Sequence, residues 1–293
     1  MILVDYSSVK MRNFFGLFAK TYKTEKITST IEFTELVKSQ LFEIHSIFNN
    51  KYNEVVICCD SKPYWRQQIF PAYKSLRSIN KNEIELHNMK IINKCADKLV
   101  DELPFKVVKV DKCEADDIIM VLAANSKEKT LIYSVDKDFI QMQHINDLVD
   151  QFSWKHNKFL TKDHFDIDLH ILLGDAVDGV PCVWCDMEYT DDVKEYMEKN
   201  NIFISPRELR SQSKSTQFYQ SLPQPVFKPS RIGAKRAAKL KESIVDPDII
   251  ENYNLNKQLV GYEGIPQVYK DEILDVFSKV QAKPFTHPNL ITF

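Results

Sequence analysis

Short apolar runs alternate with longer amphipathic segments up to about residue 180 of the chain. Five runs have the length and composition of buried β-strands: residues 1–5, 54–60, 105–110, 130–136 and 147–153. Between them, residues 31–50 and 83–103 repeat apolar side chains at helical spacing. Strands that alternate with helices are typical of a mostly parallel sheet with helices on both faces. The sequence therefore predicts an α/β fold.

The alternation stops after Pro181. Residues 182–230 are rich in Ser, Gln, Asn and Pro, which predicts a loop-rich insertion with one helix near 190–200. A glycine turn at 232–235 then opens a helix, and a final helix is predicted near 268–280. We expect three segments: an α/β domain (1–181), an insertion (182–230) and a helical region (231–293).

Aspartates stand at the ends of three of the predicted strands. Asp5, Asp60 and Asp136 each follow an apolar run. The carboxyl ends of parallel strands share one edge of a sheet, where ligands bind. Like charges gathered there disfavour mutual ionisation unless a cation lies between them. The spacing therefore predicts a divalent-metal site at this edge.

Six more carboxylates extend this acidic set. The full set is Asp5, Asp60, Glu114, Asp116, Asp117, Asp136, Asp138, Asp175 and Asp178. Each short motif alone is explained by a helix N-terminus or a turn, but their joint occurrence favours a metal site. A donor set made only of oxygen selects Mg²⁺ or Mn²⁺ over Zn²⁺. Nine acids exceed the needs of one ion, which indicates two Mg²⁺ ions and hydrolysis of a phosphodiester by a two-metal mechanism.

The formal net charge of −2 hides a basic excess, because 39 Lys and Arg residues face 32 acids once the nine candidate ligands are set aside from the 41. The segment 61–82 holds no acid and mixes bases with aromatic rings. Its Lys74 and Arg77 are the candidate catalytic cations for a phosphate, and Tyr73 offers a stacking face to a terminal base. The alternative is a solvated basic loop. A second basic stretch, 205–241, contains the glycine turn, whose backbone N–H groups can bind an anion.

Cysteine usage and hydropathy predict a cytoplasmic protein. The adjacent Cys58 and Cys59 lie inside an apolar run and suit buried reduced thiols. Cys182 and Cys185 have the spacing of half a zinc site, but no second pair completes it, so zinc chemistry is not expected. There is no apolar run long enough to span a membrane, and the first strand begins too early to leave room for a signal peptide.

Taken together, these motifs resemble the 5′ nuclease (flap endonuclease) family, which includes phage 5′ exonucleases, phage ribonuclease H and the 5′ nuclease domain of bacterial DNA polymerase I. Within the family, the motifs look like those of the phage members. The resemblance rests on Leu3-Val4-Asp5, Cys58-Cys59-Asp60, Tyr73-Lys74 with Arg77, Glu114-Ala115-Asp116-Asp117, Ser134-Val135-Asp136-Lys137-Asp138, Gly174-Asp175-Ala176-Val177-Asp178-Gly179-Val180-Pro181 and Ile232-Gly233-Ala234-Lys235.

The resemblance implies a metal-dependent 5′ to 3′ exonuclease, flap endonuclease or RNase H that removes RNA primers and 5′ flaps. In the family, the acids matching Asp5, Asp60, Glu114, Asp116 and Asp117 surround one Mg²⁺, and those matching Asp136, Asp138, Asp175 and Asp178 lie around a second. Mn²⁺ is the expected substitute. In the family, the 5′ strand passes through a gateway and arch, which correspond to the segment at about 61–82 of this chain. The residues that match this region are Arg66, Tyr73, Lys74 and Arg77.

The glycine turn, with Gly233, Lys235 and Arg236, resembles the helix-hairpin-helix element that grips duplex DNA, where K⁺ often binds. One departure concerns its position, because in the family this element follows the Gly-Asp loop almost directly, whereas here residues 182–230 intervene. Expected substrates are branched or nicked duplex DNA and RNA–DNA hybrid, bound by a monomer. A single-stranded DNA-binding protein and a sliding clamp are further candidate partners. The apolar tail could dock on the clamp, although packing of the tail on its own domain is the favoured interpretation. For a phage protein, the location is the host cytoplasm.

Two other functions stay open at this point. The first is a non-catalytic, structure-specific DNA-binding protein on the same fold, although retention of all nine acids argues against it. The second is a PIN-like ribonuclease that cuts single-stranded RNA, which would need neither the glycine turn nor the basic stretch 205–241.

Overall fold

The computed structural model describes the following residues: 1–74, 81–175, 177–184, 188–204, 222–223 and 247–283. The chain divides into two compact units. Unit 1 comprises Met1–Lys62, Lys81–His164 and Gln267–Phe293, and unit 2 comprises Pro63–Asn80 and Phe165–Pro266. Among the residues so described, no helix is both long enough and apolar enough to cross a membrane.

Unit 1 is built on a six-stranded sheet with the strand order β3-β2-β1-β4-β5-β6. Its strands are β1 (Ile2–Asp5), β2 (Val55–Cys59), β3 (Lys106–Lys109), β4 (Thr130–Tyr133), β5 (Val149–Ser153) and β6 (Lys158–Leu160). The first five strands run parallel, and β6 pairs with β5 in the antiparallel direction. The predicted α/β fold is therefore confirmed. β1, β2 and β4 are buried throughout, which is why each appears in the sequence as an unbroken apolar run.

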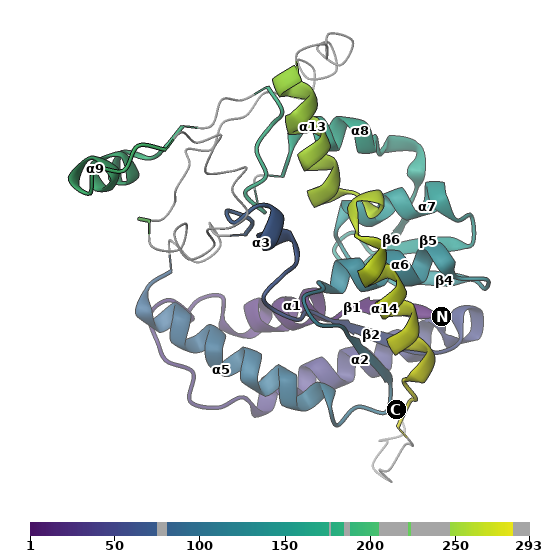
Figure 1. Cartoon of the computed structure of the whole chain (residues 1–293). Helices are drawn as coiled ribbons and strands as arrows, with labels where there is room; N and C mark the ends of the chain where they lie inside the picture. Colours follow the sequence, from purple (N-terminus) through teal and green to yellow (C-terminus); the bar gives the residue numbers. More distant parts are fainter. Residues whose placement is uncertain (75–80, 176, 185–187, 205–221, 224–246, 284–293) are drawn as a thin grey trace. The chain divides into compact units, whose positions relative to one another are not determined.

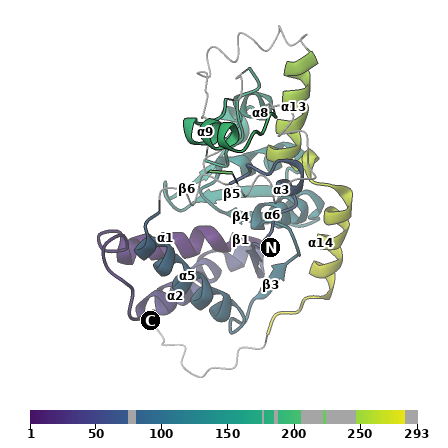
Figure 2. The same cartoon turned by 60° about the vertical axis from the view of Figure 1, so that its left-hand side comes forward.

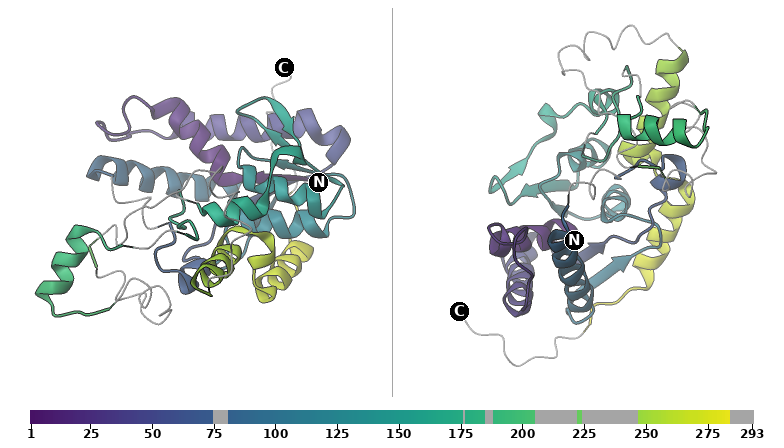
Figure 3. Two further views of the ribbon diagram at one scale, coloured as in Figure 1. Left: turned by 90° about the horizontal axis from the view of Figure 1, so that it is seen from above. Right: turned by 90° about the vertical axis from the view of Figure 1, so that its left-hand side faces the viewer.

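Helices cover both faces of this sheet (Figures 1 and 3). On one face lie α1 (Tyr6–Phe18), α2 (Ile31–Tyr52) and α5 (Glu83–Val100), and on the other lie α6 (Ala115–Asn125), α7 (Met142–Ile145) and α14 (Gln267–Lys279). The short 3-10 turns η1 (Lys137–Gln141) and η2 (Lys162–His164) complete the unit. The main apolar core lies between the sheet and the first helical layer, where Ile2, Val4, Val55 and Ile57 meet Phe33, Leu41 and Ile92.

Unit 2 is mainly helical (Figure 2). Its elements are α3 (Arg66–Ile69), α8 (Ile167–Leu173), α9 (Asp191–Lys199), α13 (Pro247–Val260) and the 3-10 turn η4 (Tyr262–Gly264). α8 packs against α13. A separate apolar core joins Tyr64, Phe70 and Tyr73 to Val193 and Leu259.

Two late helices agree with the sequence analysis, because α9 lies within the predicted 190–200 and α14 nearly coincides with 268–280. The glycine turn at 232–235 and most of the predicted insertion lie outside the described residues. The domain boundaries proposed from the sequence stay a prediction.

Candidate metal centre

Three neighbouring strands end at the same edge of the sheet. Val4 of β1 is in register with Ile57 of β2 and with Tyr133 of β4. Asp5 is the last residue of β1, and Asp60 follows β2 directly. Because the strands are parallel, both carboxylates and the turn after β4 occupy the carboxyl edge of the sheet, as the strand pattern predicts.

Asp5 is held at both of its carboxylate oxygens. It caps α1, with Oδ1 accepting a hydrogen bond from the Ser8 backbone N–H at 3.0 Å. Its Oδ2 accepts from the Ser134 hydroxyl at 3.2 Å. Since only 8% of Asp5 is exposed, this carboxylate has little freedom to reorient. These neutral donors orient Asp5 without cancelling its negative charge.

Asp60 connects the first turn of α1 to the start of α6. Its Oδ1 accepts from the Ala115 backbone N–H at 2.9 Å, and its Oδ2 accepts from the Ser7 hydroxyl. Ala115 is the first residue of α6, so the carboxylate faces the positive end of that helix. This contact brings the Asp60 loop next to the acidic first turn of α6.

The acidic first turn of α6 is largely buried. Glu114 and Asp117 are 1% and 0% exposed, and Asp116 is half-buried. The Glu114 backbone N–H donates to Asp117 Oδ2 at 2.9 Å. Carboxylates removed from water in this way are costly unless cations or strong hydrogen bonds compensate them. Hard divalent cations fit this donor set, which consists of carboxylate oxygens.

Asp136 and Asp138 lie in the turn that leaves β4. Asp136 is exposed and caps η1, its Oδ1 accepting from the Asp138 backbone N–H at 3.0 Å. The Asp136 backbone N–H donates to the Ser134 hydroxyl at 3.2 Å, and that hydroxyl in turn donates to Asp5. A continuous hydrogen-bonded path thus joins the ends of β1 and β4.

In unit 2, the loop after α8 carries Asp175 and Asp178. Asp175 Oδ1 accepts from the backbone N–H groups of Val177 at 2.7 Å and of Asp178 at 3.3 Å. Gly174 ends α8 with φ +68°, and a Cβ there would lie 2.4 Å from the Val180 carbonyl oxygen. A glycine is therefore required at this turn, which sets the direction in which the Asp175 loop leaves the helix.

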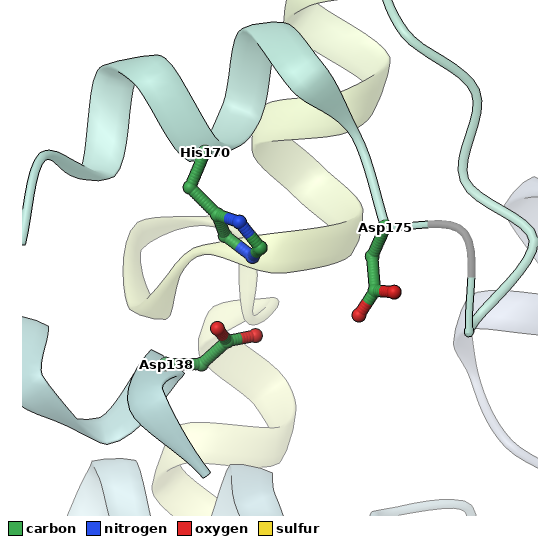
Figure 4. Close-up of side chains that lie close together, drawn as sticks. All are labelled: Asp138, His170 and Asp175. Atoms are coloured by element: carbon green, nitrogen blue, oxygen red, sulfur yellow. The ribbon is translucent and has the colours of Figure 1, made fainter. Parts of the chain in front are cut away.

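His170 is a candidate ligand that the sequence analysis did not select. It lies on the last turn of α8, and its imidazole nitrogen and an Asp175 carboxylate oxygen are within 4.8 Å of each other (Figure 4). The signal in the sequence was a histidine five residues before the aspartate, at the end of a short apolar helix. It adds a nitrogen donor to a set that otherwise contains only oxygen, and imidazole suits Zn²⁺, Cu, Fe and Ni better than Mg²⁺.

Tyr73 and Lys74 contact Asp178. The Tyr73 hydroxyl donates to Asp178 Oδ2 at 3.0 Å, and Lys74 Nζ lies 3.5 Å from the same oxygen. The Lys74 backbone N–H also donates to the Asp178 carbonyl oxygen at 2.7 Å. Lys74 adopts a φ of 58°, a left-handed conformation that is uncommon for residues with a side chain. Two residues predicted to contact nucleic acid thus meet one predicted metal ligand.

The first 168 residues match a known family. Residues 1–168 fit the model of a family described as 5′-3′ exonuclease, N-terminal resolvase-like domain. The chain belongs to this family. The resemblance inferred from the motifs is confirmed.

Two curated proteins are similar to this 5′-3′ exonuclease family member. A 5′-3′ exonuclease of Buchnera aphidicola is 31% identical over 199 residues, which cover 62% of this chain and 65% of the relative. Ribonuclease H of Enterobacteria phage T4 is 29% identical over 194 residues, which cover 62% of each chain. The chain thus spans somewhat less than two thirds of the length of either relative.

A solved structure shares the fold of this family member. The bacteriophage T5 flap endonuclease, in a pseudo-enzyme-product complex with DNA and metal ions, superposes with a TM-score of 0.55 at 16% identity. The superposition covers 94% of this chain and 96% of that chain. It agrees with the fold class predicted from the alternation of strands and helices.

In this family member, Arg66 lies in the interior of unit 2. It is 3% exposed, its Nε donates to the Leu259 carbonyl oxygen at 2.8 Å, and its guanidinium lies 4.4 Å from the centre of the Trp65 ring. In the structure, this side chain fastens α3 to the end of α13. The other predicted nucleic-acid contacts, Arg77, Gly233, Lys235 and Arg236, lie outside the described residues.

The described cysteines are not in disulfides; they are Cys58, Cys59, Cys95, Cys113 and Cys182. Burial and the neighbouring Asp60 carboxylate raise the pKa of Cys59 to about 12, which keeps this thiol protonated at neutral pH. Cys185, the second half of the Cys-x-x-Cys motif, lies outside the described residues.

Proposed function

We propose that this chain is a divalent-metal-dependent 5′ to 3′ nuclease that hydrolyses phosphodiester bonds in branched or nicked duplex DNA and in RNA–DNA hybrids. The observation that carries the proposal is the set of oriented acids at one edge of the sheet in unit 1. Asp5 and Asp60 lie at the ends of adjacent parallel strands and are held by neutral donors, and one of these donors to Asp60 is the first residue of α6. Membership of the 5′-3′ exonuclease family supports this proposal.

The nine acids predicted from the sequence remain the proposed ligands of two ions. In unit 1 they are Asp5, Asp60, Glu114, Asp116, Asp117, Asp136 and Asp138, and in unit 2 they are Asp175 and Asp178. When bound, two divalent ions activate a water molecule and stabilise the attacking and leaving oxygens of an in-line displacement. Mg²⁺ is the proposed natural ion, because oxygen donors dominate the set, with Mn²⁺ as its substitute.

The residues of the chain contribute orientation and charge to this reaction. Hydroxyls and backbone N–H groups orient the carboxylates of Asp5 and Asp60 at the edge of the sheet. Lys74 would meet the scissile phosphate with its ammonium group, which Asp178 balances at 3.5 Å in the substrate-free chain. Tyr73 is 3% exposed and orients Asp178 through the hydrogen bond that its hydroxyl donates to that carboxylate.

The biological part of the proposal is removal of RNA primers and 5′ flaps during DNA replication. The phage ribonuclease H among its relatives and the DNA-bound phage flap endonuclease that shares its fold favour such substrates. The same proposal holds that the chain acts as a monomer and that K⁺ binds at the glycine turn. It also holds that the chain docks on a sliding clamp or a single-stranded DNA-binding protein. The turn and the apolar tail lie outside the described residues.

The test compares Asp136→Asn with the unaltered chain on 5′-labelled flap, nicked duplex and RNA–DNA hybrid substrates, with Mg²⁺ and with excess chelator. Loss of one ligand charge should reduce cleavage at least about 100-fold while DNA binding persists. Asp147→Asn serves as the control, because that side chain is 91% exposed and pairs with Lys162 on the surface.

Near-normal turnover of Asp136→Asn would contradict the two-metal assignment. A single-stranded RNA substrate forms a further arm of the experiment. Cleavage of that RNA without any requirement for a duplex would favour a PIN-like ribonuclease, and metal-independent binding without cleavage of any substrate would favour a DNA-binding protein.

A further inference from the structure

Gln151 is a fully buried amide in the middle of β5, the strand next to β4. It is 0% exposed and lies in register with Ile132. Its Nε2 donates to two backbone carbonyl oxygens beyond the end of β4, that of Ser134 at 3.2 Å and that of Asp136 at 2.5 Å. The side chain therefore holds the turn in which the chain leaves the sheet.

The chemistry of this turn explains why an amide occupies the position. β4 ends at Tyr133, so the following carbonyl groups continue beyond the regular ladder and need other donors. One amide nitrogen has two hydrogens and can serve both carbonyls. The opposite orientation of the amide would place Oε1 against two carbonyl oxygens, so the two acceptors settle how the group points. Oε1 itself has no hydrogen-bond partner among the described residues.

The two carbonyl groups belong to residues that orient predicted metal ligands. The Ser134 hydroxyl donates to Asp5 Oδ2 at 3.2 Å and accepts from the Asp136 backbone N–H at 3.2 Å. Asp136 in turn caps η1, where Asp138 lies. A shift of the backbone at 134–136 would therefore move the carboxylates of Asp5 and Asp136 relative to each other.

We propose that Gln151 is a positioning residue for the divalent cation, acting through the backbone of Ser134 and Asp136. The inference rests on the proposed function, because it assumes that Asp5 and Asp136 are metal ligands. Groups that orient metal ligands in this way typically affect metal affinity or activity 10- to 100-fold. Gln151 adds no charge to the site, so its effect arises through geometry.

Asn146 provides a matched control in the same unit. Its Nδ2 also donates to two backbone carbonyl oxygens, those of Ala123 and Ser126, at 2.9 Å each. These carbonyls lie at the carboxyl end of α6, whereas the acidic turn lies at the other end of this 11-residue helix, about 16 Å away. Loss of Asn146 removes the same kind of interaction without touching the strand ends that carry the acids.

The experiment measures Mg²⁺ binding to the full chain without nucleic acid, by calorimetry and by the Mg²⁺-dependent rise in Tm. It compares Gln151→Met, which keeps the side-chain length but lacks the donors, with Asn146→Leu. Gln151→Met should weaken Mg²⁺ binding about 10- to 100-fold, and Asn146→Leu should lower Tm without changing Mg²⁺ affinity. In cleavage assays, Gln151→Met should need more Mg²⁺ for its half-maximal rate while the KM for DNA stays the same.

Gln151→Asn keeps the test decisive if Gln151→Met does not fold, because it retains a neutral amide but is one methylene shorter and so loses the reach to the two carbonyl oxygens. It should weaken Mg²⁺ binding in the same direction. The inference is overturned if the Gln151 variant binds Mg²⁺ as tightly as the unaltered chain, or if the Asn146 variant loses as much affinity. If the unaltered chain itself binds no Mg²⁺, the proposed function fails and this inference fails with it.

Discussion

Asn256 on α13 forms hydrogen bonds with both ends of the loop that carries Asp175 and Asp178. It is fully buried, and its Nδ2 donates to the Ile171 carbonyl oxygen at 3.0 Å and to the Pro181 carbonyl oxygen at 2.7 Å. Ile171 precedes this loop on α8, and Pro181 follows it. The same side chain therefore fixes where the acidic loop begins and where it ends.

Asn256→Ala should destabilise this part of unit 2 by about 2–4 kcal/mol. Each lost hydrogen bond contributes about 0.5–1.5 kcal/mol, and leaving a buried carbonyl without a donor costs about 1–3 kcal/mol, partly offset by relaxation. Asn256→Asp should be worse than the alanine variant, because it replaces the donor with an oxygen that faces two carbonyl oxygens. These magnitudes concern local opening, since a chain of two units need not unfold in one step.

Amide hydrogen exchange read by mass spectrometry measures that local opening directly. A loss of about 2–4 kcal/mol corresponds to exchange about 30- to 1,000-fold faster in the α8 segment, because each 1.4 kcal/mol is a factor of ten. Asn254→Ala, at an exposed position on the same helix, is the control and should leave exchange unchanged. If Asn256→Ala exchanges no faster than this control, the two hydrogen bonds do not hold the loop and the reasoning is refuted.

Three further outcomes follow from particular contacts. Gly174→Ala should lower Tm in thermal unfolding and reduce cleavage, because a Cβ would lie 2.4 Å from neighbouring backbone carbonyl oxygens at a φ of +68°. Lys74→Met should lower the free energy of unfolding by about 3 kcal/mol and lower kcat, since it removes the cation beside Asp178, whose side chain is 16% exposed. An unchanged kcat in a cleavage assay would exclude a catalytic role for Lys74. Burial alone would raise the pKa of Asp150, but hydrogen bonds from Tyr52 and Lys51 outweigh this effect and hold the pKa below its ordinary value of 3.8. Ionised Asp150 therefore stabilises the folded state above about pH 4, and this stabilisation is lost as pH falls through the pKa of Asp150 in the folded chain. Tyr52→Phe should therefore weaken the fall of Tm at acid pH.

The sheet could be predicted because its central strands are buried on both faces. β1, β2 and β4 consist almost entirely of apolar residues, so their position and direction follow from the sequence. β6 was missed because it has three residues at an edge, two of them exposed, and so leaves no periodic signal. α1 was missed for another reason, since Asp5 both ends β1 and caps the helix, and no turn residue separates the two elements.

The acids could be selected from the sequence, but the groups that hold them could not. Carboxylates at strand ends are visible locally, whereas Ser134 and its acceptor Asp5 are 129 positions apart. The buried Arg66 illustrates the same limit, because its acceptor, the Leu259 carbonyl, lies 193 positions away. A basic residue among aromatic residues predicts an exposed contact with nucleic acid just as well as it predicts a buried cation stacked on a ring.

Both acidic loops are held by a neutral amide, and the reason lies in the charge of the site. Gln151 holds the turn of Asp136 and Asn256 holds the loop of Asp175, each through two backbone carbonyl oxygens. A lysine at either position could also donate to carbonyls, but its charge would lower the local negative potential and compete with a divalent cation for the acids. An amide fixes the backbone while the carboxylates keep their full charge. At these loops the proposed metal ions would supply the positive charge, and at Asp178 Lys74 also does so.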